Sequence, residues 1–221
     1  LATVVGLLFY FFSIRPLKNA SPISMVIITI GGSIFIRGLS MLIWDKDTHA
    51  LPPFTGETPI FLAGATILPQ HLWILAITAI LIIINRWFFY RTISGKAMRA
   101  CSYNPRAAGL VGVDVRKMVL VSFVISAAMG SLAGIIVAPL TMTSYDVGVM
   151  LGLKGFCAAI IGGMSSGLPT VLGGLILGVL ESMGAGLISS GYKDAIAFVI
   201  LLIILFVRPQ GLFGKPESER V

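Results

Sequence analysis

The chain has 221 residues, of which 57% are hydrophobic and 11% are charged, and its formal net charge is +7. The charged fraction is about half of that in soluble domains, and the mean hydropathy of +0.98 exceeds what a soluble core of this size needs. These values exclude a disordered chain, a secreted disulfide scaffold and an ordinary soluble enzyme, and they leave a polytopic helical membrane protein.

Seven apolar segments follow one another along the chain, and each is a candidate membrane-spanning helix. They cover residues 1–14, 22–44, 71–90, 118–140, 149–164, 170–188 and 194–207. The first begins without a start methionine, and basic residues follow it instead of preceding it, unlike in a signal peptide. We therefore predict an all-α polytopic bundle of about seven spans, a single transmembrane domain over 1–221 that lacks its N-terminal part. Segments 149–164 and 194–207 are short, which favours tilted, broken or partly re-entrant helices.

Basic residues predict the orientation, because lysine and arginine accumulate on the cytoplasmic side of a membrane. Here they lie mainly after the first span, in the loop 91–117 and in the C-terminal tail, three regions that alternation places on one face. The loop 45–70 falls on the opposite, periplasmic face. We therefore predict a cytoplasmic C-terminus. The +7 charge is a topology signal, since a nucleic-acid surface would need interleaved aromatic residues on a soluble face.

The cytoplasmic loop 91–117 contains two stretches of small residues, 97–100 and 105–110, which favour two short helices. Asn104 suits the N-cap of the second helix and Pro105 its first turn, and Gly95 and Gly112 would bound the pair. The loop has two interpretations at this point. It is either a solvated basic connection that only fixes topology or a docking element for a cytosolic subunit.

Small residues are dense in the second half of the chain, where Gly130 with Gly134 and Gly174 with Gly178 form GxxxG pairs. Such faces let helices approach closely in lipid. The simple interpretation is helix packing, and the functional one is that these helices line a pathway and move against each other.

A Gly-rich stretch interrupts the apolar pattern between segments 149–164 and 170–188 and favours a tight turn or a broken helix. Within it, Gly163, Ser165 and Gly167 fit the GxSxG pattern of a nucleophile elbow. A serine hydrolase would need a base beside the serine. The two histidines, His49 and His71, are predicted near the opposite face. We therefore predict no catalytic residue.

Three charges lie within apolar segments: Arg37, Lys154 and Glu181. Charges inside a membrane are costly and usually face a bundle interior or water. Arg37 and Lys154 could snorkel outward, whereas Glu181 has a shorter side chain and is harder to explain in this way. It forms either a structural ion pair with one of the two bases or part of a substrate path or gate. Cys101 and Cys157 are predicted too far apart for a disulfide, and no metal site is predicted.

The order and spacing of residues in the loop 91–117 match those of a known family of transporters. The matching residues there are Gly95, Lys96, Ala97, Met98, Arg99, Ala100, Asn104, Ala107, Ala108, Leu110, Gly112 and Val113. The match continues through Leu153-Lys154-Gly155-Phe156, Gly162-Gly163 and Glu181 to Arg208-Pro209-Gln210-Gly211-Leu212-Phe213-Gly214. The chain thus resembles the permeases of branched-chain amino acid ABC importers over most of its length, particularly the LivH-type subunit. Members of this type are longer at the N-terminus, in agreement with a missing start.

The resemblance implies a permease of a bacterial inner membrane that carries leucine, isoleucine, valine or similar small amino acids. Its implied partners are a second permease, two cytosolic ATPases, a periplasmic amino-acid-binding protein and membrane lipid, with no nucleic acid. The implied ATPase-coupling residues are Gly95, Met98, Arg99, Ala100, Asn104, Ala107, Leu110 and Gly112. Possible path or gating residues are Glu181, Lys154, Gly163 and Ser165. In the implied mechanism, closure of the ATPases on ATP moves the loop and tilts the helices.

Energy coupling must come from elsewhere, because the sequence contains no GxxxxGK[ST] phosphate loop. We therefore expect a transport subunit that is not itself an enzyme and has no cofactor, with ATP bound and hydrolysed by partner subunits. Two alternatives stay open. One is an ABC permease for urea or short-chain amides, and the other is a channel or secondary transporter that needs no ATP.

Overall fold

The computed structural model describes residues 2–15, 22–56, 58–62, 65–163, 167–187 and 189–214. These residues are helical nearly throughout, which confirms the predicted all-α class. The α-helices are α1 (Ala2–Phe9), α2 (Pro22–Trp44), α3 (Pro69–Arg91), α4 (Ile93–Tyr103), α5 (Pro105–Leu110), α6 (Val115–Val137), α7 (Val147–Gly162), α8 (Gly167–Leu187) and α9 (Lys193–Val207). The π-helical turn η1 (Tyr10–Ile14) follows α1, and the 3-10 turn η2 (Ser190–Tyr192) precedes α9. The strands β1 (Ile60–Leu62) and β2 (Ala65–Ile67) pair antiparallel.

All seven predicted segments contain helices, but they are not all of spanning length. Within the described residues, the helices α2, α3, α6 and α8 are long and apolar enough to cross a membrane. The 16 residues of α7 measure about 24 Å, which is less than the roughly 30 Å of hydrocarbon in a bilayer. The helix α9 has 15 residues and is shorter still. The prediction of about seven spans is therefore corrected to four helices of spanning length, accompanied by shorter apolar ones.

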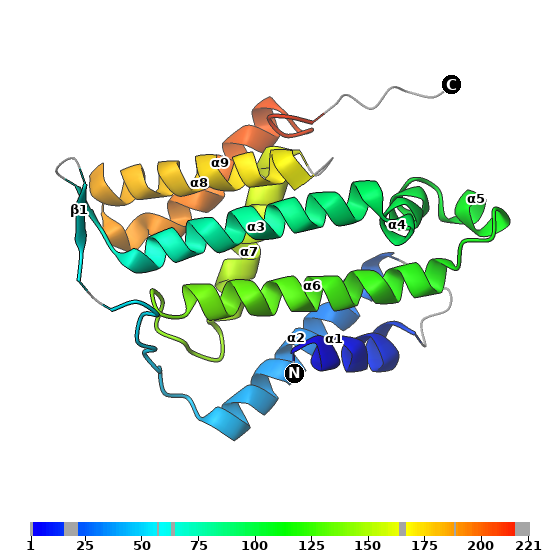
Figure 1. The fold of residues 1–221 in the computed structure, drawn as a ribbon, viewed down its shortest axis with the longest axis horizontal. Helices are drawn as coiled ribbons and strands as arrows, with labels where there is room; N and C mark the ends of the chain where they lie inside the picture. The colour runs from blue at the N-terminus through cyan, green and yellow to red at the C-terminus, as the bar shows by residue number, and fades with distance from the viewer. Residues whose placement is uncertain are drawn as a thin grey trace. The chain divides into compact units, whose positions relative to one another are not determined.

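The chain divides into two compact units, Leu1–Tyr145 and Asp146–Val221. In the first unit, α3 and α6 lie side by side, and α4 and α5 connect them at one end (Figure 1). The helix α1 packs along α6, where the ring centroids of Phe9 and Tyr10 lie 6.3 and 5.9 Å from that of Phe123. The Tyr10 hydroxyl also donates to the Arg116 carbonyl oxygen at 3.1 Å. Aromatic contacts therefore fix α1 against α6.

The connection between α2 and α3 is tied to the end of α6 that lies away from α4 and α5. Gln70 is 1% exposed, and its Nε2 donates to the Ile136 carbonyl oxygen at 2.7 Å while its Oε1 accepts from the Phe54 N–H at 3.3 Å. His49 and Thr143 exchange two backbone hydrogen bonds of 2.9 Å. A buried amide must find partners, and here those partners hold the predicted periplasmic loop against the helix ends.

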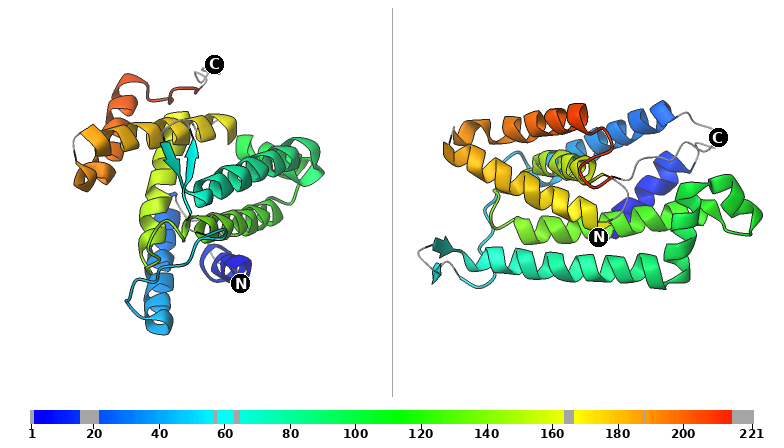
Figure 2. Two further views of the ribbon diagram at one scale, coloured as in Figure 1. Left: turned by 60° about the vertical axis from the view of Figure 1, so that its left-hand side comes forward. Right: turned by 90° about the horizontal axis from the view of Figure 1, so that it is seen from above.

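The second unit is built from α7, α8 and α9, of which α8 and α9 form a helical hairpin (Figure 2). Its core consists of five buried residues: Cys157, Ala158, Ile161, Leu177 and Ala197. At Gly162 and Gly173 the backbones of α7 and α8 nearly touch, since a Cβ built on Gly173 would lie 2.6 Å from the Gly162 nitrogen. Small residues thus permit the close approach, as expected for helices packed in lipid.

Gly173→Ala is expected to destabilise this unit by about 1–3 kcal/mol, because the added methyl group forces α7 and α8 apart. Gly178→Ala on the same helix is the matched control, since nothing described lies within 4 Å of a Cβ there. Alanine is the better helix former, so the control should be neutral or slightly stabilising. Thermal unfolding followed by circular dichroism in detergent measures both variants. Equal melting temperatures would contradict the close approach.

Candidate functional site

The helices α3 and α4 meet at a break at Thr92, whose backbone is extended with φ −86° and ψ 151°. Its hydroxyl donates to the Phe88 carbonyl oxygen at 2.7 Å and accepts from the Gly95 N–H at 3.0 Å, which caps α4. Gly95 is buried, and a Cβ there would lie 2.7 Å from the Phe89 Cα. The prediction that Gly95 bounds the helical pair is therefore wrong. It lies inside α4, where its missing side chain lets α4 pack closely against the end of α3.

The second short helix, α5, begins and ends as predicted. The Asn104 Oδ1 accepts from the backbone N–H groups of Arg106 and Ala107 at 3.1 and 3.0 Å, and Pro105 occupies the first turn. After α5 the chain adopts φ +88° at Gly112, a conformation that favours glycine. These local signals explain why the N-cap and both bounds of α5 were predictable.

Apolar side chains stand exposed on this helical pair. Tyr103, Leu110 and Val111 are 86%, 92% and 82% exposed, and Ala100 and Ala107 are exposed beside them in the sequence. We call these five residues the docking surface. The loop 91–117 that holds them is predicted to lie outside the membrane, where exposed apolar side chains often mark interaction sites. The sequence reasoning missed Tyr103 and Val111, although large apolar residues in a polar loop were a usable signal.

The remaining predicted coupling residues face other neighbours. Met98 is half-buried, and the guanidinium of Arg99 lies 4.6 Å from the ring centroid of Tyr90 on α3.

Asp114 caps α6 by accepting from the Lys117 N–H at 3.2 Å, and this bond holds the pKa of its carboxyl below the ordinary value. The stabilisation from this cap is therefore present at neutral pH and is lost only as the pH falls through the lowered pKa.

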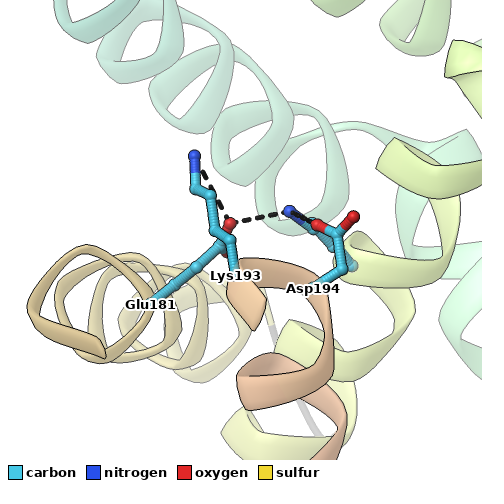
Figure 3. A network of polar contacts seen from close by, with 4 residues as sticks. Glu181, Lys193 and Asp194 are labelled. Atoms are coloured by element: carbon cyan, nitrogen blue, oxygen red, sulfur yellow. Dashed lines mark hydrogen bonds and ion pairs between the residues drawn. The ribbon is translucent and has the colours of Figure 1, made fainter. Parts of the chain in front are cut away.

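The second unit brings four charged residues together, and we call Lys154, Glu181, Lys193 and Asp194 the charge cluster (Figure 3). Lys154 Nζ lies 2.7 Å from Glu181 Oε1 and 2.6 Å from Asp194 Oδ1. Lys193 Nζ lies 3.5 Å from the same Glu181 oxygen. The cluster therefore joins α7, α8 and the start of α9, and its formal charges cancel.

Burial differs strongly across the charge cluster. The side chains of Glu181 and Lys154 are 9% and 21% exposed, whereas those of Asp194 and Lys193 are 49% and 55% exposed. Removal of a buried charge from water is costly unless the charge is paired. The structural ion pair between Glu181 and Lys154, one of the two predicted alternatives, is thus present. A role in a path or gate stays a prediction.

Of the last two predicted path residues, the structure describes only Gly163, which follows α7. Gly163 ends that helix with φ +98°, and a Cβ there would lie 2.6 Å from the Gly214 nitrogen, so this glycine accommodates the chain after α9. Ser165 lies outside the described residues. Among the residues that the structure describes, no group of three or more potential metal ligands occurs.

Comparison with protein families matches residues 1–205 to the family described as the permease component of branched-chain amino acid transport systems. The high-affinity branched-chain amino acid permease LivH of Salmonella typhimurium is 34% identical over 215 residues, which cover 94% of this chain and 69% of the relative. The LivH protein of Escherichia coli K12 is 33% identical over the same shares. The permease BraD of Pseudomonas aeruginosa is 32% identical, again over 94% and 69%. No solved structure shows significant similarity.

Proposed function

The chain belongs to the family of branched-chain amino acid transport permeases, and we propose that it is the membrane-spanning subunit of an ATP-driven importer. Its apolar helices and its relatives make it a multi-pass membrane protein of the transport class. The observation that carries the ATP-driven proposal is the docking surface on α4 and α5. A channel or secondary transporter has no need for an apolar surface of this kind on a cytoplasmic loop.

We assign ATP binding and hydrolysis to two cytosolic subunits that contact the docking surface. This division of labour is supported by the absence of a GxxxxGK[ST] motif from the sequence. A second permease completes the translocation path, and a periplasmic binding protein delivers the substrate. The proposed orientation places α4, α5 and the C-terminus in the cytoplasm, because the basic residues gather there.

The proposed mechanism couples the loop to the helices through the break at Thr92. Because α4 is capped and packed tightly onto the end of α3 at Gly95, movement of the docking surface is transmitted to α3 and not absorbed by a flexible loop. The charge cluster is proposed to act as a gate that opens when α8 and α9 separate from α7. Each state must then differ in its contacts with substrate or nucleotide.

The proposed substrates are leucine, isoleucine and valine, which is the class printed in the names of LivH and BraD. Uptake into vesicles that contain the protein with a second permease, two ATPases and a binding protein tests the assignment. We expect uptake of labelled leucine to need ATP and all partners, and to be inhibited by unlabelled isoleucine or valine but not by urea. Inhibition by urea alone would favour the amide alternative, and uptake without the ATPases would favour a channel or secondary transporter.

A further inference from the structure

A pocket of about 370 Å³ lies at the end of α3 that adjoins α4. Its lining consists of Ile83, Arg86, Trp87, Tyr90 and Arg91. Helical periodicity places residues at these spacings on one face. Neither the coupling mechanism nor the charge cluster involves this pocket, so its combination of arginines and aromatic rings needs a separate explanation.

Three arginines lie in or beside the pocket: Arg86 and Arg91 line it, and Arg99 of α4 contacts the ring of Tyr90. The guanidinium carbons of Arg99 and Arg86 lie 4.6 and 5.4 Å from the ring centroid of Tyr90, so a single ring holds two cations. Within the described part of the chain, neither these two arginines nor Arg91 forms an ion pair. These guanidiniums carry positive charge beside the same ring, and a bound anion would offset that charge.

The position of the pocket along α3 indicates which kind of anion it would bind. Tryptophan and tyrosine mark the level of the lipid headgroups, and Trp87 and Tyr90, 62% and 51% exposed, lie in the last turns of this 23-residue spanning helix. Ile83 is 66% exposed and lies further along the helix toward the hydrocarbon. The arginines of the pocket are therefore placed to contact a phosphate group, and its apolar side chains are placed to contact an acyl chain.

We propose that this pocket binds the headgroup of an anionic phospholipid. Arg86, Arg91 and Arg99 contact the phosphate, Tyr90 orients two of these guanidiniums, and the first acyl chain lies along Trp87 and Ile83. A basic pocket beside a spanning helix is the expected kind of site for such a lipid. Because Arg99 belongs to α4, the lipid ties the docking element to α3. This consequence rests on the proposed function, whereas lipid binding itself does not.

Quenching of Trp87 fluorescence tests the proposal in the full chain with Trp44→Phe and Trp73→Phe. Vesicles contain phosphatidylglycerol or phosphatidylcholine with a nitroxide on the acyl chain near the headgroup. We expect labelled phosphatidylglycerol to quench Trp87 more strongly than labelled phosphatidylcholine. Each replacement of an arginine by glutamine should reduce this preference about fivefold. Arg116→Gln at the start of α6 removes the same charge elsewhere and should keep the preference. Inorganic phosphate at millimolar concentration should not displace the lipid.

The aromatic ring provides a second, independent measurement. Tyr90→Phe keeps the ring under both guanidiniums and should retain the lipid preference, whereas Tyr90→Leu should reduce it. Mass spectrometry of phosphatidylglycerol retained after detergent exchange gives the same comparison with all tryptophans present, in case the two tryptophan substitutions impair folding. Equal quenching by both lipids, or an unchanged preference in Arg86→Gln with Arg99→Gln, would overturn the proposal.

Discussion

Glutamate in place of Ala107 is expected to reduce ATP-dependent uptake about 100-fold while the protein remains folded in the membrane. Ala107 is exposed on α5, so the substitution meets no neighbour within the subunit. In the assembled importer the same position would lie against an ATPase. A buried, unpaired carboxylate at a protein interface costs about 2–5 kcal/mol, which is enough to separate the subunits. Ala100→Glu on α4 should have the same effect.

The matched controls separate a change in docking from a change in charge or folding. Ala107→Ser changes the side chain at the same position by one hydroxyl group and should retain most of the uptake. Thr48→Glu places an equal charge at an exposed position of the loop 45–70, on the predicted opposite face, and should also be tolerated. The measurements are binding-protein-stimulated ATP hydrolysis and leucine uptake in vesicles, with the amount of inserted protein determined in parallel. Normal uptake in both glutamate variants would remove the docking assignment.

The elements that could be predicted from the sequence are those specified by local signals. The segment 22–44 coincides with α2 (Pro22–Trp44) because an apolar run ends where charged residues begin. The start of α5 was predictable because an N-cap asparagine and a proline act on the backbone next to them. The apolar runs behind α7 and α9 were short enough to predict that these two helices would not cross a membrane as straight spans, and the two helices have 16 and 15 residues.

Features that depend on helix packing were less accessible. The GxxxG spacing singled out Gly174 and Gly178, whereas α7 and α8 approach closely at Gly162 and Gly173, two other glycines of the same small-residue-rich region. Spacing along one helix does not determine which face meets a neighbour. Nothing in the sequence indicated that Gly95 would pack against the backbone of α3. That contact exists only when α4 is packed against the end of α3.

The charge cluster combines a predictable part with an unpredictable one. Glu181 and Lys154 could be identified because charges within apolar segments need a partner. Asp194 was predicted at the first position of the segment 194–207 and Lys193 in the loop before it, where a charge needs no explanation. Only the packing of α9 against α7 and α8 brings them within 3.5 Å and 2.6 Å of the buried pair. The sequence therefore predicted two of the four residues in the charge cluster.

Lys154→Met is expected to destabilise the second unit by about 3–5 kcal/mol and to abolish uptake. The substitution leaves the Glu181 carboxylate buried, with only the more distant Lys193 at 3.5 Å, and it removes the partner that lies 2.6 Å from Asp194. Breaking a buried pair by removing one partner is far more costly than replacing both. Lys193→Met is the matched control, because its side chain is 55% exposed and exposed pairs contribute about 0–1 kcal/mol.

The double variant Lys154→Met with Glu181→Gln distinguishes a structural pair from a gate. Both charges are then absent, so the thermal stability of the detergent-solubilised protein should return close to that of the parent. If the charge cluster acts as the proposed gate, uptake should nevertheless stay low. The neutral pair lacks the ion pair that holds α7 against α8 in the closed state, so the gate no longer closes properly. Recovery of both stability and uptake would contradict the gating role and leave the pair with a purely structural one. Asp194 retains Lys193 as a neighbouring residue in this variant, so the result reports mainly on the buried pair.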